Sequence, residues 1–414
     1  MLRAALTAGL VFGAAACAKE FPNSTLVPHS EFGRDIDYLF NILFIGGTVV
    51  FVLVEAGLLY TIFRYRQREG APEPKQVHGN TALEITWTLI PALVLAFIAV
   101  PTVRTIFRTQ AKAVPNALQV EVIGHQWWWE FRYPQLGVTT ANELYLPKGR
   151  TVNFALKTQD VLHSFWIPAI AGKRDLIANH TNYLWFTPDD TTGAWNGFCA
   201  EFCGASHANM RFRVFTVSPQ EFDAWVAHQK TGPAFGAPAA APAAGAAPGA
   251  TPSVNQVATS TAQTTPAAGG APPTPAGPQP QVANVSTATF TMDQLPRHVL
   301  PSTPLPKGLS LSVTSGDAAR GAQLYRTSAC IACHKVEGVS PGVVGPNLTH
   351  IGSRTTIAAG LYPNDFKHLT LWIKNAPAMK PGSLMPALGK SATTPGGYDD
   401  QQVADIAAYL LSLK

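Results

Sequence analysis

The sequence predicts a multidomain membrane protein made of a two-helix transmembrane hairpin, an all-β domain and an all-α domain. Two long apolar runs lie near the amino terminus, short alternating segments follow them, and helical periodicity marks the carboxy end. A chain of 414 residues with so uneven a composition is too long for one ordinary domain. Its net charge of +5 is small and spread along the chain, which argues against a nucleic-acid-binding protein.

The two apolar runs form the predicted hairpin. Tyr38–Phe63 is almost wholly apolar and long enough to cross a hydrocarbon layer of roughly 30 Å. The second run, Ile85–Phe107, contains Pro91 and Pro101, which neighbouring protein can accommodate inside a membrane. The loop between the runs, residues 64–68, is rich in arginine. The positive-inside tendency places this loop in the cytoplasm, so everything after the second run is expected outside it.

Glu55 lies inside the first apolar run, where a carboxylate is energetically costly unless it meets a partner. We therefore expect Glu55 to contact another subunit.

Residues 1–17 read as a signal peptide, with Arg3 followed by apolar residues. The small residues before Cys17 resemble a bacterial lipoprotein cleavage site, and whether Cys17 is lipidated stays open.

The rest of the chain divides by pattern. Alternation of apolar and polar residues predicts strands, Gly and Pro punctuate them as turns, and a tract dominated by Ala, Pro and Gly is typical of an extended linker. The apolar stripe near the carboxy terminus predicts an amphipathic helix. No role emerges for residues 281–316. The expected units are a signal-like peptide (1–17), the hairpin (38–108), an all-β domain (113–230), the linker (231–308) and a helical domain (309–414).

Four of the five cysteines occur as two close pairs, and Cys17 stands alone. An odd number in tight pairs is unlike a disulfide framework and favours metal or haem chemistry, although an exported protein could oxidise each pair to a disulfide. The first pair lies in the block Cys199–Met210, which holds two thiols, an imidazole and a thioether. Such soft donors favour copper, and zinc is the main rival. His163, at the end of a candidate strand, is a candidate second histidine.

The second pair belongs to the segment Cys330-Ile331-Ala332-Cys333-His334. In a C-x-x-C-H segment the two thiols take up the vinyl groups of a haem and the histidine ligates its iron. The alternative is a redox dithiol followed by a chance histidine. The segment therefore predicts one covalently bound haem c, held by Cys330 and Cys333, with His334 as an axial ligand.

The first part of the chain, from the hairpin to about residue 217, resembles subunit II of haem-copper cytochrome c oxidases. The resemblance rests on the hairpin, Gly124–Trp129, His163-Ser164-Phe165 and Cys199–Met210 in this order. It implies a cupredoxin barrel with a dinuclear copper centre of two copper ions. It further implies that Cys199 and Cys203 bridge the ions, that His163 and His207 each cap one, and that Met210 and the Glu201 carbonyl are weak outer ligands.

The same resemblance suggests further roles and shows one departure. Trp127 is the expected point where electrons enter, the Glu201 carboxylate is a candidate magnesium ligand at the subunit I contact, and Glu84 resembles a glutamate near the mouth of a proton channel. Trp128 and Trp129 are expected to pack in the barrel core and at an interface. Ala178-Asn179-His180 stands where the family usually has Pro-Gly-Arg, so the family arginine cannot be carried over and His180 is expected on the surface.

The carboxy-terminal part resembles a class I cytochrome c, through Gly345–Leu348 and Lys380–Pro386. This resemblance implies Met385 as the sixth iron ligand, with Met379 as the alternative. Methionine opposite histidine raises the iron potential, which suits passing electrons to copper. With this fusion, the whole chain resembles subunit II of caa-type oxidases.

The implied function is the electron-accepting subunit of a respiratory terminal oxidase, embedded in the lipid of the bacterial inner membrane with its copper and haem domains outside the cytoplasm. The implied partners are subunit I, which would reduce oxygen, subunit III, and a soluble or membrane cytochrome c donor. The linker would keep the haem domain at high effective concentration over the copper domain. Alternatives are a copper-containing subunit of a nitric oxide reductase, a quinol oxidase subunit, which the intact copper ligand set disfavours, and a haem-based sensor.

Overall fold

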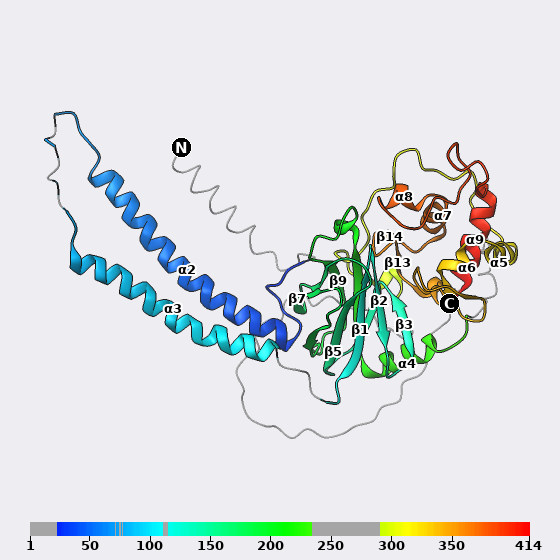
Figure 1. Ribbon diagram of the computed structural model, residues 1–414, viewed down its shortest axis with the longest axis horizontal. Helices are drawn as coiled ribbons and strands as arrows, with labels where there is room; N and C mark the ends of the chain where they lie inside the picture. Colours follow the sequence, from blue (N-terminus) through cyan, green and yellow to red (C-terminus); the bar gives the residue numbers. More distant parts are fainter. Residues whose placement is uncertain (1–22, 71, 74–75, 77, 111–114, 234–289) are drawn as a thin grey trace, which may run out of the picture.

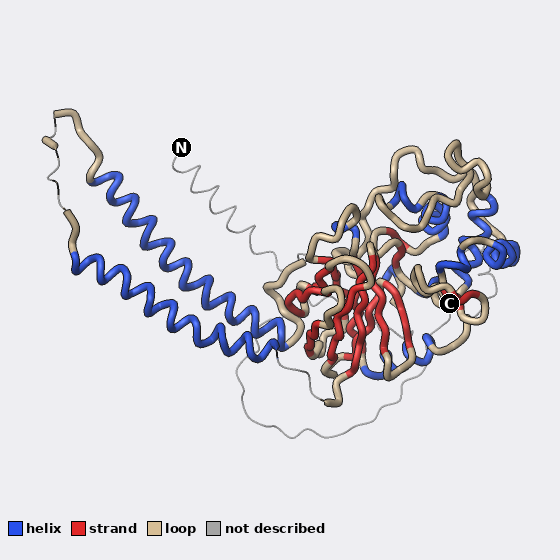
Figure 2. The backbone as a smooth tube through the Cα atoms, viewed as in Figure 1, coloured by secondary structure: helices blue, strands red, loops and turns tan. Residues whose placement is uncertain are grey.

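Two long helices project from a head in which a β-sandwich and a helical domain lie side by side (Figures 1 and 2). This arrangement comes from a computed structural model. The expected signal peptide and Cys17 lie outside the described residues, which are 23–70, 72–73, 76, 78–110, 115–233 and 290–414.

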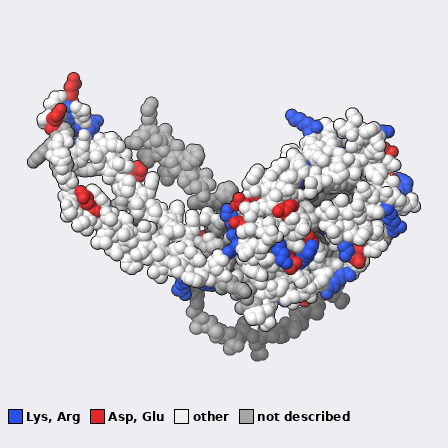
Figure 3. Space-filling view, viewed as in Figure 1, with Lys and Arg blue, Asp and Glu red and all other residues white. Residues whose placement is uncertain are grey.

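The paired helices are α2 (Glu31–Arg64) and α3 (Thr81–Gln110), and both are long and apolar enough to cross a membrane. Figure 3 shows few charged residues along the pair, and charged groups gather at its far tip. Pro91 and Pro101 lie inside α3 without ending it. Helix α2 begins before the expected apolar run because the Ser30 side chain caps it, accepting a hydrogen bond from the Gly33 amide at 3.0 Å.

Ten strands build the sandwich as two five-stranded sheets, ordered β3-β2-β1-β5-β8 and β4-β10-β9-β6-β7. Buried and partly exposed residues alternate along strands such as β1 and β5, as the sequence pattern predicts. Helix α4 (Pro219–Gln229) follows the last strand. The strands are β1 (Leu118–His125), β2 (Trp128–Tyr133), β3 (Val138–Ala141), β4 (Glu143–Pro147), β5 (Val152–Thr158), β6 (His163–Ile167), β7 (Ala171–Leu176), β8 (Asn182–Phe186), β9 (Gly193–Cys199) and β10 (Arg211–Val217).

Aromatic rings fill the space between the two sheets. The Trp129 side chain is fully buried, and its ring centroid lies 5.7 Å from that of Phe165 and 5.4 Å from that of Phe212. Phe165 and Phe212 stack at 5.0 Å. This packing holds the ends of β6, β9 and β10 in place, and it confirms that Trp129 serves the core.

The carboxy-terminal domain is built mainly from helices, with the chain ends of the domain packed together. Helix α5 crosses α9 closely at Gly321, where an added Cβ would come within 1.9 Å of the Asp405 carbonyl oxygen. Tyr325 and Tyr409 pack across the same crossing with ring centroids 5.4 Å apart. Its elements are α5 (Ala318–Thr327), α6 (Cys330–Cys333), β11 (Lys335–Val336), β12 (Ser340–Pro341), η3 (Ile351–Ser353), β13 (Thr356–Ile357), β14 (Tyr362–Pro363), α7 (Phe366–Lys374), α8 (Ala376–Met379) and α9 (Asp400–Ser412).

The segment before this domain is not all linker, which differs from the expected range of 231–308. Phe290, Leu295 and Val299 are buried in the core of the sandwich, and the Phe290 ring stacks on Phe215 with centroids 4.7 Å apart. A short 3-10 helix, η2 (Met292–Gln294), lies between these anchors. The sequence pattern missed them because three apolar residues are diluted by a long tract of Ala, Pro and Gly.

The α5–α9 crossing generates a stability prediction. Gly321→Ala should destabilise the helical domain by about 1–3 kcal/mol, because the new methyl group must push the two helices apart. Chemical unfolding followed by circular dichroism measures this change. Gly396→Ala is the matched control, since a Cβ there meets no described atom within 4 Å. Equal unfolding midpoints for the two variants would contradict the close crossing.

Candidate functional site

Residues from two parts of the sequence, His163 and the block Cys199–Met210, meet at one end of the sheet that contains β6, β9 and β10. His163 begins β6, Cys199 ends β9, and Met210 lies directly before β10. Strands β6 and β9 are antiparallel neighbours, with Phe165 opposite Cys199, so the start of one lies beside the end of the other. The loop between β9 and β10 brings Cys203 back toward Cys199, and His207 begins the short helix η1 (His207–Asn209).

The side chains form a compact cluster of sulfur and imidazole donors. The Cys199 and Cys203 sulfurs lie 3.7 Å apart, with the Nδ1 atom of His163 3.7 Å from the first and the Nδ1 atom of His207 3.6 Å from the second. The Met210 sulfur lies 3.8 Å from Cys203. The structure therefore brings together every residue that the sequence predicted as a copper ligand through its side chain.

The Glu201 main chain completes this cluster. Its carbonyl oxygen lies 3.2 Å from the Cys199 sulfur, where the resemblance places a weak outer ligand. Its side chain is half-buried.

The cluster fits a soft metal better than a disulfide. A disulfide needs sulfurs about 2.05 Å apart, and Cys199 and Cys203 are free. The contact between the two sulfurs lowers the pKa of Cys199 and raises the pKa of Cys203. A second thiolate therefore requires added positive charge, which a metal supplies. Thiolate, thioether and imidazole together are the donors that copper prefers.

Asp160 orients the histidine that faces Cys199. Its Oδ1 atom lies 2.8 Å from the Nε2 atom of His163, which leaves Nδ1 toward the sulfur. Its Oδ2 atom accepts the Gln126 amide at 2.6 Å. Carboxylates that fix a ligand histidine in this way tune metal sites. Sequence reasoning missed Asp160, and its position three residues before His163 was the available signal.

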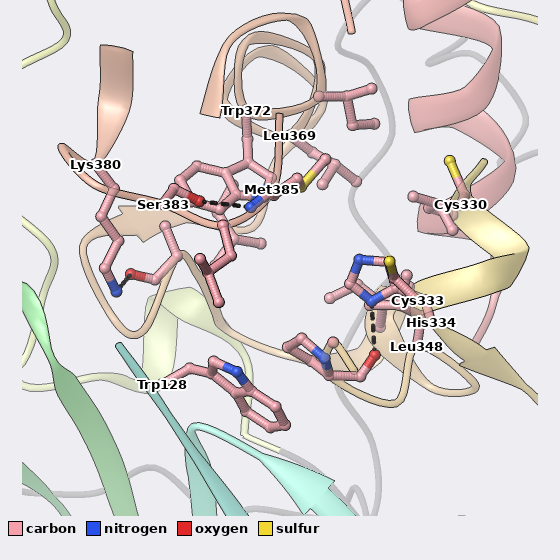
Figure 4. A pocket seen from close by; sticks show the side chains of 18 of the residues that line it. Trp128, Cys330, Cys333, His334, Leu348, Leu369, Trp372, Lys380, Ser383 and Met385 are labelled. Atoms are coloured by element: carbon pink, nitrogen blue, oxygen red, sulfur yellow. Dashed lines mark hydrogen bonds between the residues drawn. The ribbon is translucent and has the colours of Figure 1, made fainter. Parts of the chain in front are cut away.

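The second site is a cavity of about 250 Å³ in the carboxy-terminal domain, with Cys330, Cys333, His334 and Met385 in its walls. The Nδ1 atom of His334 lies 2.8 Å from the Pro346 carbonyl oxygen, which fixes the ring and leaves Nε2 as the ligating atom. Figure 4 shows His334 and Met385 facing each other across the cavity. Met379 is buried in the domain core and is not among the cavity-lining residues.

The walls of this cavity suit a porphyrin. They are largely apolar, with side chains such as Leu348, Leu369 and Trp372. A Cβ at Gly345 would come within 2.5 Å of the His334 ring, so only glycine leaves room for the imidazole. The Arg354 guanidinium also lines the cavity, and burial lowers its pKa to about 10. It therefore stays charged near neutral pH and can face an anionic group.

The copper-type domain closes one side of the same cavity, which sequence reasoning missed. Gln126, Trp127, Trp128 and Asn142 contribute to its lining. Trp128 lies at the edge of the cavity in Figure 4 and stacks on His125 with ring centroids 4.1 Å apart. Trp128 thus does more than pack within its own domain.

Trp127 connects the two sites. Its Nε1 atom donates to the Cys203 carbonyl oxygen at 2.9 Å, next to the sulfur cluster. On its other side its ring touches the haem-type domain, because a Cβ at Gly382 would come within 2.8 Å of it. Lys380 donates its Nζ atom to the Trp127 carbonyl oxygen at 2.5 Å. One half-buried indole therefore contacts both domains.

The remaining predicted residues lie apart from these sites. Glu84 lies in the first turn of α3, where its Oε1 atom accepts the Asn80 amide at 3.3 Å as a helix cap. Glu55 is exposed on α2, and His180 is exposed in the turn after β7, as expected for a surface histidine.

Comparison with known families gives three matches in order along the chain. Residues 27–105 match the transmembrane domain of cytochrome c oxidase subunit II, residues 136–217 match its periplasmic domain, and residues 318–414 match cytochrome c. The second match contains all the predicted copper ligands, and the third contains the C-x-x-C-H segment and Met385.

Curated relatives cover most of this chain. Cytochrome c oxidase subunit 2 of Alkalihalophilus pseudofirmus is 32% identical over 375 residues, which are 88% of this chain and 83% of that protein. The corresponding subunit of Bacillus sp. strain PS3 is 32% identical over 368 residues, 85% of this chain and 80% of that protein. The crystal structure of the periplasmic domain of cytochrome oxidase subunit II from Bradyrhizobium japonicum is 30% identical, covers 28% of this chain and 97% of that chain, and has a TM-score of 0.27.

These matches agree with the architecture described above: two apolar helices, a cupredoxin-like β domain of the periplasmic type and a helical cytochrome c domain. The chain is a membrane protein, and it belongs to the cytochrome c oxidase subunit II family, in the form that carries a carboxy-terminal cytochrome c domain.

Proposed function

We propose that this chain receives electrons from a cytochrome c donor and passes them to the oxygen-reducing subunit I of a haem-copper oxidase. The observation that carries the proposal is the pair of free cysteine sulfurs 3.7 Å apart, with the Nδ1 atom of one histidine beside each. Copper and haem, when bound, supply reversible one-electron oxidation and reduction. Metal-free protein would have no group with which to accept an electron.

The protein's own residues would hold two copper ions in a fixed frame. Cys199 and Cys203 would bridge them, His163 and His207 would each cap one, and Met210 with the Glu201 carbonyl would be weak outer ligands. The packed ends of β6, β9 and β10 support this frame. A rigid frame keeps ligand movement small when the charge on the metals changes.

The second domain would hold one haem c. Cys330 and Cys333 would form the covalent links, and His334 and Met385 would ligate the iron from opposite faces. The contact of the His334 Nδ1 atom with the Pro346 carbonyl supports this assignment, because it leaves only Nε2 for the metal. With both axial positions filled, the iron would transfer electrons rather than bind oxygen.

Trp127 is the proposed route between the two sites, since it contacts the Cys203 carbonyl and the loop that leads to Met385. Electrons would then leave toward subunit I. The nitric oxide reductase alternative is not favoured, because the curated relatives described above are cytochrome c oxidase subunits.

The membrane setting completes the proposal. The arginine-rich loop after α2 would lie in the cytoplasm of a bacterium, which places the copper and haem domains outside the inner membrane. Subunits I and III would pack against the helices. At the contact with subunit I, the Glu201 carboxylate would bind magnesium and Glu84 would lie near the mouth of a proton channel.

The copper assignment predicts the behaviour of a serine variant. Cys203→Ser should abolish the near-infrared absorption of the copper centre, because one bridging sulfur is lost, while the c-type haem spectrum stays intact. Absorption spectroscopy of the purified chain measures both, and the haem band serves as the internal control. A retained near-infrared band would refute the bridging role.

The haem ligation predicts a change of potential. Met385→Ala should lower the haem midpoint potential by on the order of 0.1 V or more, because methionine ligation raises it. A redox titration measures this, with Met379→Leu as the matched control, which should leave the potential unchanged. An unchanged potential in Met385→Ala together with a lowered potential in Met379→Leu would assign the iron ligand to Met379.

The proposed route predicts a kinetic effect. Trp127→Phe should slow electron transfer from haem to copper, because the indole hydrogen bond to the Cys203 carbonyl is lost. Flash-induced reduction of the haem, followed at the near-infrared copper band, measures the rate. Trp185→Phe, at a half-buried tryptophan on β8, is the control with an expected unchanged rate. Equal rates for both variants would exclude Trp127 from the route.

A further inference from the structure

Glu143 and Arg213, two neighbouring charged residues of the sandwich, both contact the haem domain. Glu143 on the edge strand β4 is the register partner of Arg213 on β10. Both are buried, with exposed fractions of 3% and 2%. Figure 1 shows β13 and β14 of the haem domain beside the sandwich. Both side chains make hydrogen bonds to the haem domain that covers this part of the sandwich.

Glu143 binds the start of β13. Its Oε1 atom accepts hydrogen bonds from the Thr355 amide at 2.7 Å, the Thr355 hydroxyl at 2.6 Å and the Thr356 amide at 3.2 Å. Burial raises the pKa of the Glu143 carboxyl, which reports the cost of removing it from water. The three donors and the nearby Arg354 guanidinium offset part of that cost.

Arg213 binds the turn that follows β13. Its Nη2 atom donates to the Gly360 carbonyl oxygen at 3.0 Å, and its Nε atom donates to the Val299 carbonyl oxygen at 2.9 Å. The turn has three successive residues in the left-handed region, Ala358, Ala359 and Gly360, with φ of 55°, 64° and 80°. This conformation is unfavourable for each alanine, because Cβ comes too close to the following carbonyl oxygen. Contacts with Arg213 and Lys380 help to hold the turn in this conformation.

The same turn leads to Trp127. The Ala358 carbonyl oxygen accepts the Lys380 Nζ atom at 3.2 Å, and Lys380 also binds the Trp127 carbonyl. The next residue, Pro381, accepts the Ser206 hydroxyl at 2.5 Å. The position of β13 on the sandwich therefore sets the position of the loop that contacts the Trp127 ring.

We propose that Glu143 and Arg213 are positioning residues that dock the chain's own haem domain on the copper domain in one orientation. An acceptor and a donor on the sandwich match two amides, a hydroxyl and a carbonyl of the haem domain. An orientation that covered Glu143 and Arg213 without these partners would bury both side chains without these hydrogen bonds, which is unfavourable, so the pair selects the orientation. The linker then needs only to keep the haem domain near the copper domain, because Glu143 and Arg213 define the docking position.

This proposal rests on the function proposed above. In the docked state, a haem held by His334 and Met385 would give up one electron and a copper pair held by Cys199 and Cys203 would accept it, so the step would balance. Docking affects the rate of this step and not the ligands of either metal. The two proposals can therefore fail separately.

Glu143→Ala in the full-length chain within its oxidase complex tests the docking. Loss of the acceptor leaves the donors on Thr355 and Thr356 unpaired, so amide hydrogen exchange in the peptide containing them should become about tenfold faster. Electron transfer from haem to copper should slow, while the near-infrared copper band and the haem spectrum stay unchanged.

Three further variants make the test specific. Glu143→Gln keeps an oxygen at the accepting position and should lie closer to wild type than Glu143→Ala. Thr355→Val removes the hydroxyl donor from the haem-domain side, so it should change exchange and rate in the same direction even if Glu143→Ala misfolds the sandwich. Glu121→Ala is the control, because its carboxylate binds Lys157 of the same sandwich at 2.7 Å, and it should change neither quantity.

The outcomes separate the two proposals. Unchanged exchange and rate in Glu143→Ala and Thr355→Val, with intact spectra, would overturn the docking role. Faster exchange with an unchanged electron-transfer rate would overturn the positioning role. A wild-type chain without the copper band would instead refute the proposed function.

Discussion

The structure depends on holding the sulfur atoms of Cys199 and Cys203 side by side without letting them bond to each other. At 3.7 Å they are too far apart for a disulfide and near enough to share metal ions. The fold achieves this by anchoring Cys199 at the end of β9 and returning Cys203 through a loop that Trp127 and Gln126 hold by the Cys203 carbonyl. Those hydrogen bonds come from the turn between β1 and β2.

That same turn is where the two domains meet. Trp127 and Trp128 help to line the haem cavity, and Lys380 reaches back to the Trp127 carbonyl. The turn between β1 and β2 thus has three roles. It supports the loop that carries Cys203, it closes one side of the haem cavity, and it connects the sulfur cluster with that cavity. Glu143 and Arg213 both bind the haem domain: Glu143 accepts from Thr355, and Arg213 donates to Gly360 in the left-handed turn Ala358–Gly360.

Much of the fold and of the candidate site could be predicted from the sequence, because short sequence patterns indicate these features. Two long apolar runs predicted α2 and α3, alternation predicted the strands, and the C-x-x-C-H spacing predicted the haem segment. The copper ligands followed from the density of soft donors between Cys199 and Met210. His163 was harder, because its position beside Cys199 depends on the pairing of β6 with β9; the sequence offered it only as a candidate at the end of a strand, and the family resemblance gave it a role.

What could not be predicted depends on contacts between distant residues. Phe290 and Val299 pack into the sandwich from within a tract whose composition is typical of a linker. Glu143, Arg213 and Lys380 look like ordinary surface charges in the sequence, and all three are buried where the two domains meet. Asp160 likewise shows its role only once the His163 ring is placed.

Metal and haem analysis of the full-length chain, purified in detergent without its partner subunits, tests the central claim most directly. The account predicts two copper ions and one c-type haem per chain. Zinc in place of copper would contradict it, because zinc has no accessible second oxidation state and the cysteine pair could then pass no electron.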